Sequence, residues 1–280
     1  MRMPSRRVPR GFSLIELIIT LVLVAIIGAA AGRMLMSQTR FYTRLAGQKD
    51  ARSVTRNARN IMQTELSMTE AGGGVVAATN DSITIRMPFA WGIYCSSSTI
   101  IRLPVDSSMY AMATLAGYAV KDTTATGVYT YTATTTAPTA GTAANCTGLS
   151  PAITAPTNGT YLALSPAPST PPAYAGSPVF LYQIVTYKFA ASTLVPGKRG
   201  LYRRVGTGTA EEILAPFDTS AKFRYYNMYA DTAQTTVPTL ANIRGIEVKL
   251  DAQSPYRASK QANPESVSIK TAIFFRNRTD

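Results

Sequence analysis

The chain has 280 residues, of which 46% are hydrophobic and 15% are charged, a charged share well below the usual quarter. It contains no histidine, which excludes Ser-His-Asp and Cys-His catalysis and every His-ligated metal site. The formal net charge of +13 attracts anionic partners such as nucleic acid or acidic lipid, although such a charge also serves solubility alone.

An apolar segment near the start of the chain carries most of the information about the class of protein. From Phe12 to Gly32 the sequence reads FSLIELIITLVLVAIIGAAAG, 21 residues with a single charge at Glu16. A helix of that length crosses the hydrocarbon core of a bilayer. The preceding residues, MRMPSRRVPRG, are basic and contain no acid. The sequence therefore predicts a leader at 1–11 and a transmembrane helix segment at 12–32.

Three interpretations of this segment compete. A secretory signal peptide accounts for the basic start and for the small residues at 29–31, and a single-span anchor accounts for the length. Neither of them accounts for Glu16, because a carboxylate deep in a bilayer costs about 3 kcal/mol. The third interpretation comes from a family resemblance, which gives that acid a partner.

The residues around the start of the span carry a family resemblance. Gly11 followed by Phe12-Ser13-Leu14-Ile15-Glu16-Leu17 resembles the cleavage and methylation motif of the type IV prepilin family. The resemblance implies that a prepilin peptidase cuts between Gly11 and Phe12, and that the new terminal Phe12 is N-methylated. It also implies that Glu16 meets the N-terminal amine of a neighbouring subunit, which would make a lipid-buried carboxylate tolerable.

The span departs from many major pilins in one respect. Those proteins have a helix-breaking proline in the second half of the apolar segment, whereas this chain has none between Phe12 and Gly32. Gly28 and Gly32 are weaker helix breakers, at about 1 kcal/mol each relative to alanine.

Helical spacing continues after the span as an amphipathic pattern. Apolar residues recur mostly three and four positions apart on one face, while arginines lie elsewhere on the helix surface. That face comprises Val54, Ala58, Ile61, Met62, Glu65, Leu66 and Thr69. Gly72-Gly73-Gly74 supplies the backbone freedom for a helix stop. We expect an amphipathic continuation over 33–71 and a whole helix about 90 Å long.

Beyond Gly74 the residues become typical of strands, with alternating apolar and polar positions between Pro, Gly and Asn. The candidate strands cover 82–87, 99–105, 179–189, 222–229, 243–250 and 266–275. A Thr/Ala/Pro-rich insertion at about 121–178 contains a short candidate strand at 129–131, and the rest is expected to be ordered loop or partly mobile surface. The prediction is an α+β fold, with a long N-terminal helix packed on an antiparallel β-sheet headpiece over 75–280.

Cys95 and Cys146 are the two cysteines of the chain. In an exported domain we interpret them as a disulfide that closes a loop of about 50 residues, worth about 4 kcal/mol by the chain-entropy model. The alternative is a pair of unpaired buried thiols.

No arrangement of residues favours catalysis, so we expect no enzyme activity, cofactor or metal. Glu211-Glu212 is an adjacent acidic pair, but neighbours on a strand point to opposite faces and make poor acid–base partners. Gly206-Thr207-Gly208 lacks the third glycine and the following helix of a phosphate-binding loop, and is predicted to be a turn.

Basic and aromatic residues interleave at 187–189 and 222–226, which makes Lys222 and Arg224 candidate anion contacts for DNA. Strand alternation offers a plainer account, in which Phe223 and Tyr225 face the core while the two cations face solvent. A basic loop around 198–204 is an equally good contact for an acidic neighbouring subunit.

The C-terminal half is similar to PilW-type minor pilins and to J-type pseudopilins, through Gly200-Leu201-Tyr202-Arg203-Arg204, residues 213–217 and Phe274-Phe275-Arg276-Asn277. The resemblance implies a minor pilin that initiates or joins the tip complex of a type IV pilus. The alternatives are a J-type pseudopilin of a type II secretion system and a filament-borne DNA-uptake receptor. The tip subunit of a pseudopilus often lacks the acid, so Glu16 indicates lateral packing against a neighbour.

The same resemblance implies the partners and the location. The partners are a prepilin peptidase, other major and minor pilins, and the inner-membrane pilus assembly machinery. The protein is expected to cross the inner membrane once, with a periplasmic headpiece, and then to enter a pilus or pseudopilus filament.

Overall fold

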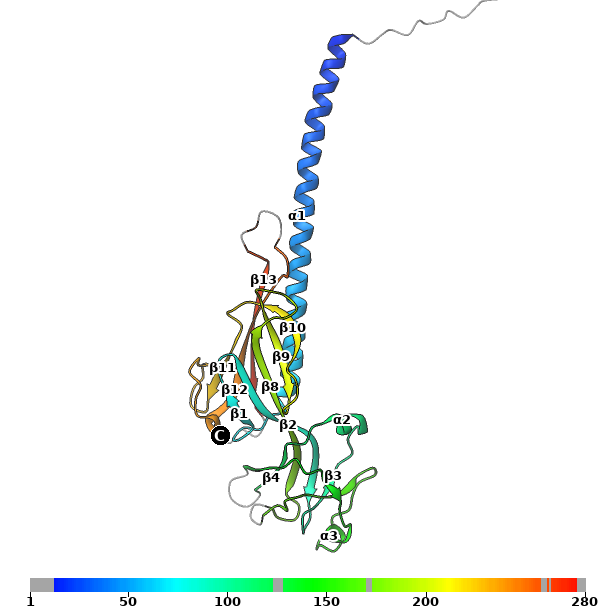
Figure 1. Ribbon diagram of the computed structural model, residues 1–280, viewed down its shortest axis with the longest axis vertical. Helices are drawn as coiled ribbons and strands as arrows, with labels where there is room; N and C mark the ends of the chain where they lie inside the picture. Colours follow the sequence, from blue (N-terminus) through cyan, green and yellow to red (C-terminus); the bar gives the residue numbers. More distant parts are fainter. Residues whose placement is uncertain (1–12, 123–127, 170–172, 258–260, 262, 276–280) are drawn as a thin grey trace, which may run out of the picture.

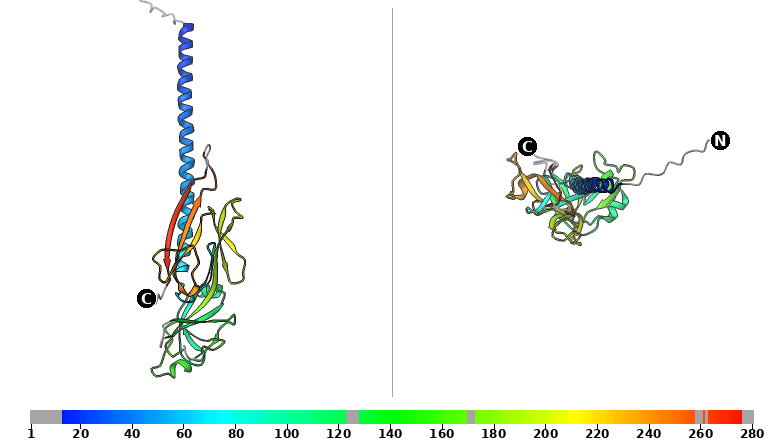
Figure 2. Two further views of the ribbon diagram at one scale, coloured as in Figure 1. Left: turned by 90° about the vertical axis from the view of Figure 1, so that its left-hand side faces the viewer. Right: turned by 90° about the horizontal axis from the view of Figure 1, so that it is seen from above.

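A computed structural model describes residues 13–122, 128–169, 173–257, 261 and 263–275. Figure 1 shows one long helix whose C-terminal half lies along a β-sheet headpiece, while its N-terminal half extends beyond the headpiece. The two further views in Figure 2 show the helix along one side of the headpiece. This arrangement confirms the predicted α+β class.

The helix α1 (Leu14–Leu66) has 53 residues and is about 80 Å long at 1.5 Å per residue. Its buried residues recur three or four positions apart, which places them on one face. They are Gly47, Ala51, Thr55, Ala58, Met62 and Leu66. Because most of them are small, the headpiece comes close to the helix backbone. A Cβ atom added to Gly47 would lie 2.9 Å from the Oγ of Ser254.

The structure differs from the predicted helix in two places. The helix ends at Leu66, before the expected position 71. Met68 and Thr69 donate to the carbonyls three residues before them, which tightens the chain into turns and buries Thr69 and Glu70. Ile61, expected on the packed face, is 36% exposed.

Thirteen strands occur in the described part of the chain, and every pairing among them is antiparallel. They are β1 (Val75–Ala78), β2 (Ser82–Tyr94), β3 (Thr99–Arg102), β4 (Gly117–Lys121), β5 (Tyr129–Ala133), β6 (Thr139–Ala140), β7 (Thr160–Ala163), β8 (Pro178–Ala191), β9 (Arg199–Val205), β10 (Glu211–Phe217), β11 (Lys222–Asn227), β12 (Ile243–Gln253) and β13 (Ser266–Phe274). Three short helices, α2 (Ser107–Met112), α3 (Ala144–Thr147) and the 3-10 helix η1 (Leu240–Asn242), lie between strands.

Two long strands divide the headpiece into two lobes. β2 pairs with β8 from Ser82↔Lys188 to Ile93↔Pro178, with an irregularity between Pro88 and Ala90. One end of this pair belongs to the sheet that packs on α1, and the other end extends into a lobe built with β3, β4, β5 and β7 (Figure 1). We call these parts the helix lobe and the distal lobe.

The distal lobe contains most of the Thr/Ala/Pro-rich insertion. Its described residues form β5, β6, α3 and β7, where the sequence predicted mainly loop with one short strand at 129–131. Two sets of pairings explain this order. β4 joins β5 to the central strand β8, and β3 joins β7, with β6 beside it, to the central strand β2. Residues 123–127 and 170–172 of the insertion lie outside the described residues.

The main core lies between α1 and the helix lobe. Alternate residues of β8, β11 and β12 contribute Val185, Tyr187, Phe223, Tyr225, Ile246 and Val248, all at most 1% exposed. Phe223 and Tyr225 therefore face the core. The expected basic loop at 198–204 is in fact mostly strand, since Arg199–Val205 forms β9 between β8 and β10. Gly206 and Thr207 form the turn that follows.

Candidate assembly surface

The first part of α1, from Leu14 to Gly32, is apolar on all sides apart from Glu16 and Thr20. Residues 14–46 are exposed apart from the half-buried Gly32, and the large apolar side chains there include Leu14 at 80% and Val22 at 49%. In the described residues this is the one helix that is long and apolar enough to cross a membrane, with a mean hydropathy of 2.7 over its best window. Only a bilayer or neighbouring chains can cover such a surface.

Glu16 lies in the first turn of this apolar helix. Ser13 is the N-cap, and its Oγ accepts from the backbone N–H of Glu16 at 3.4 Å. A carboxylate in the first turn is favoured by the positive end of the helix dipole. The side chain of Glu16 is exposed, so it is available to a cation that approaches from outside the chain. Gly11 and Phe12, the predicted cleavage and methylation positions, lie outside the described residues.

The apolar helix continues without a break through Gly28 and Gly32. Apart from the adjacent residues and the backbone of the helix itself, no heavy atom of the described residues lies within 4 Å of a Cβ built on either glycine. Neither glycine is therefore required for packing within the chain, and both leave a narrow part of the helix surface for a neighbour to approach.

The other end of α1 is held to the sheet by an ion pair. Arg203 on β9 binds the carboxylate of Glu65 through Nε at 3.1 Å and Nη2 at 3.0 Å, and the hydroxyl of Tyr187 on β8 donates to it at 2.6 Å. Burial, followed by the nearby Glu65 charge, raises the pKa of Tyr187. The three side chains hold the C-terminal end of α1 against β8 and β9.

These anchoring residues were not recognised from the sequence. The helical spacing predicts Glu65 on the packed helix face without a role, and the sequence predicts a loop at Arg203. A carboxylate on an otherwise apolar helix face was the available signal, because such a group requires a partner when it is buried. Its partners are more than a hundred residues away in the chain, and only the fold identifies them.

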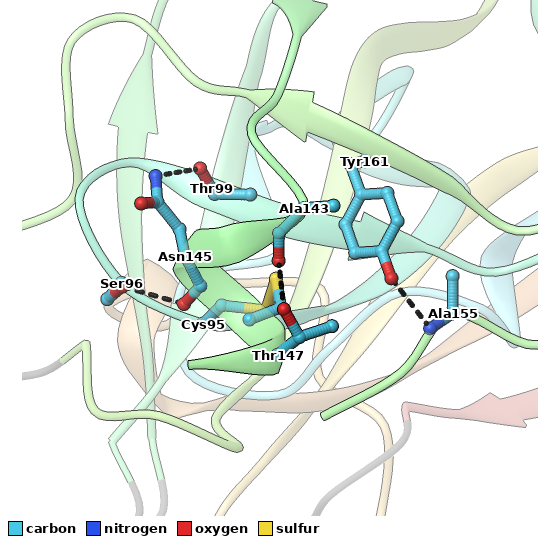
Figure 3. The surroundings of a disulfide bond; sticks show 9 residues. Cys95, Ser96, Thr99, Ala143, Asn145, Thr147, Ala155 and Tyr161 are labelled. Carbon is cyan, nitrogen blue, oxygen red and sulfur yellow. Dashed lines mark hydrogen bonds between the residues drawn. A yellow bond between two sulfur atoms is a disulfide. The ribbon is translucent and has the colours of Figure 1, made fainter. Parts of the chain in front are cut away.

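The distal lobe is closed by a disulfide between Cys95 and Cys146, with Cα atoms 4.9 Å apart. Figure 3 shows the surrounding hydrogen bonds, in which Asn145 Nδ2 donates to Thr99 Oγ1 and Ser96 Oγ donates to the Asn145 carbonyl, both at 2.8 Å. Both cysteines are at most 1% exposed. The bond therefore joins α3 of the insertion to the β2–β3 connection.

The two candidate anion contacts differ in their surroundings. Arg224 is paired with Glu247 at 2.8 Å, and its other terminal nitrogen donates to the carbonyl of Ala233. Lys222 is directly opposite Lys249 in the register of β11 and β12. Arg224 is therefore already ion-paired, whereas Lys222 lies beside another cation.

The two acids at 211–212 also differ in their surroundings. Glu211 is exposed, whereas Glu212 accepts from the Thr193 backbone N–H at 2.8 Å and from the Tyr202 hydroxyl at 3.1 Å. Burial would raise the pKa of Glu212, but bonds from Ser192, Thr193 and Tyr202 outweigh it and lower the pKa. Glu212 therefore organises the β8–β9 connection. In the described residues no group of three or more Cys, Asp or Glu side chains could hold a metal.

The chain matches the family model of the prokaryotic N-terminal methylation motif over residues 6–32, a range that includes Gly11, Phe12 and Glu16. No curated protein and no solved structure matches the chain. The motif and the exposed apolar helix support a type IV prepilin-like, membrane-anchored protein with the general role of a pilin or pseudopilin. The motif implies processing by a prepilin peptidase and assembly with other pilins.

Proposed function

We propose that the protein is a minor pilin, a structural subunit that initiates or joins the tip complex of a type IV pilus after processing by a prepilin peptidase. The observation that carries the proposal is Glu16, an exposed acid in the first turn of an apolar helix with the methylation motif. A pilus places such helices side by side and supplies the carboxylate with a cation.

The proposed cleavage between Gly11 and Phe12 supplies that cation. The new amine of Phe12 in one subunit would lie near the membrane depth of Glu16 in its neighbour, and pairing would offset much of the cost of a charge in lipid. Once extracted from the inner membrane, the apolar half of α1 would exchange lipid for neighbouring helices. The headpiece, fixed to α1 by Glu65, would then lie on the outside of the filament.

The large headpiece favours a minor rather than a major subunit, because the distal lobe adds a second body at the end furthest from the apolar helix (Figure 1). A J-type pseudopilin of a type II secretion system would have the same methylation motif, N-terminal acid and apolar helix, and is the second candidate. Co-purification distinguishes the two: a minor pilin would be recovered with sheared pili, whereas a pseudopilin would be recovered with the secretion machine.

The first experiment is mass spectrometry of the protein extracted from membranes of cells with and without their prepilin peptidase. The proposal predicts a chain that begins at Phe12 and carries one extra methyl group, and an uncut chain when the peptidase is absent. A chain that begins after Ala31, or one that stays uncut in both strains, contradicts the proposal.

A further inference from the structure

We propose that a cavity where the two lobes meet binds an extended peptide segment of a partner protein, through one large apolar side chain and the backbone carbonyls beside it. This inference goes beyond the proposed role as a filament subunit and does not depend on processing at Gly11.

The cavity lies beside the C-terminal end of α1, on the sheet face that the helix covers. Val185 on β8 packs in the core shared with α1, whereas Gln183, two residues earlier on the same face, lines the cavity. Gln183 is directly opposite Met87 in the β2–β8 pairing, so the two side chains share that face. The volume of about 490 Å³ falls within the range of about 300–1,000 Å³ that is usual for ligand pockets.

Apolar side chains from three parts of the chain form the walls of the cavity. They are Met68 after α1, Met87, Phe89 and Trp91 on β2, and Met109 and Met112 on α2. Methionine is unbranched and flexible, so a wall with four methionines can adapt to the shape of a bound side chain. The lining therefore suits a large apolar group.

The α2 side of the cavity is open. The helix α2 lies beside β2 where the lobes meet (Figure 1), and it has no buried residue. Met109 is 64% exposed and Met112 is 75% exposed. An opening of this kind lets a chain enter and leave, which favours a peptide segment over an enclosed small molecule.

Two hydrogen-bond donors in the wall have no partner among the described residues. Gln183 is 7% exposed, and its Oε1 accepts from the backbone N–H of Thr114 at 3.3 Å, which leaves Nε2 as a donor. Neither this Nε2 nor the indole Nε1 of Trp91 bonds to another described residue. A nearly buried donor gains free energy from an acceptor, and the carbonyls of an extended peptide supply acceptors.

An ion pair in the same wall bears on the charge of the ligand. Glu65 and Arg203 both line the cavity and lie 3.0 Å apart, so their charges neutralise each other. A charged ligand group would lose water there without gaining a free countercharge. The site therefore favours an uncharged side chain such as that of phenylalanine or leucine.

Trp91 is the one tryptophan of the chain, so its fluorescence reports directly on the cavity. The full chain is placed in lipid nanodiscs, which avoid free detergent that would enter an apolar cavity, and is titrated with the blocked peptide acetyl-AAFAA-amide. The expected result is a saturable change in Trp91 emission. Acetyl-AAAAA-amide should give no change over the same concentration range.

Two variants test the assigned contacts. Met112→Lys places a charge at the opening and should weaken binding about tenfold, and Gln183→Leu removes the donor and should weaken it about fivefold. Leu194→Lys is the matched control, because Leu194 is 68% exposed in the β8–β9 connection and does not line the cavity; it should leave binding unchanged.

Three results would overturn the proposal. The peptide gives no saturable change in emission, Leu194→Lys weakens binding as much as Met112→Lys, or acetyl-AAAAA-amide binds as tightly as acetyl-AAFAA-amide. A further titration with dodecanoate distinguishes the class of ligand. A saturable change with dodecanoate and none with the peptide would identify an acyl chain as the ligand and would also overturn the proposal.

Discussion

The hydroxyl of Tyr187, in the middle of the headpiece sheet, donates a 2.6 Å hydrogen bond to the carboxylate of Glu65 in the last turn of α1. Arg203 binds the same carboxylate from the neighbouring strand. These contacts add to the packing that holds α1 on the headpiece, and the chain between Glu65 and Tyr187 includes the whole distal lobe. Glu65 therefore links the C-terminal end of α1 to two strands of the headpiece.

Tyr187→Phe should lower the free energy of unfolding by about 2 kcal/mol, because it removes a hydrogen bond to a partly buried charge. Denaturant unfolding of the full chain in detergent measures the change. Tyr256→Phe is the control, since Tyr256 is 81% exposed and should give no measurable change. Equal effects of the two substitutions would contradict the role assigned to Glu65.

Stability should fall in alkaline solution. Burial raises the pKa of Tyr129 to about 12, and burial together with the Glu65 charge raises the pKa of Tyr187 above its ordinary value of 10.0. Since the folded pKa exceeds the unfolded one, this stabilisation is complete below pH 10 and is lost as the pH rises through the folded pKa. The free energy of unfolding should therefore be level up to about pH 9 and decline above pH 10, less steeply in Tyr187→Phe. A free energy of unfolding that already declines near neutral pH would contradict the assignment of this effect to the buried tyrosines.

Replacing both Cys95 and Cys146 by alanine should destabilise the distal lobe by about 4 kcal/mol, the chain-entropy value for a loop of this length. Hydrogen exchange is the suitable measurement, because it reports each lobe separately. Amides of β3 and β7 should exchange faster, while amides of β11 and β12 should change little. Uniform acceleration across both lobes would show that the headpiece unfolds as one unit.

Ala58→Leu should cost about 2 kcal/mol, because Ala58 is fully buried between α1 and the sheet and a larger side chain overpacks that contact. Ala46→Leu adds the same atoms to the same helix at an exposed position and serves as the control. Thermal unfolding compares the two variants. A similar melting temperature for both would show that the helix is not packed against the headpiece as described.

Glu16→Ala should leave membrane insertion and cleavage intact but reduce incorporation into filaments at least tenfold, since the charge partner of the neighbouring amine is lost. Immunoblots of sheared filaments and of membranes measure the ratio. Thr20→Val removes a polar group four residues away on the same helix face, where Thr20 Oγ1 donates to the Leu17 carbonyl, and should be incorporated normally. Normal incorporation of Glu16→Ala would exclude the carboxylate from assembly.

Features that depend on a local pattern follow from the sequence alone. The apolar run at 12–32, the helical spacing after it and the alternation at 222–229 and 243–250 each reflect the period of one element, so helix, strand and burial of Phe223 follow from neighbours in the chain. Glu16 and the adjoining motif can be identified for the same reason, because their residues are close together in the sequence.

Features that depend on strand register and on distant partners appear only in the folded chain. Pairing of β5 with β4, and of β7 with β3 and β6, orders the Thr/Ala/Pro-rich insertion as part of the distal lobe, which composition alone does not indicate. Glu65 gains its partners, and Met87 comes to lie opposite Gln183, through contacts between elements far apart in sequence. A shift of one residue in strand register would point a strand's side chains to the opposite face, so no local pattern specifies these neighbours.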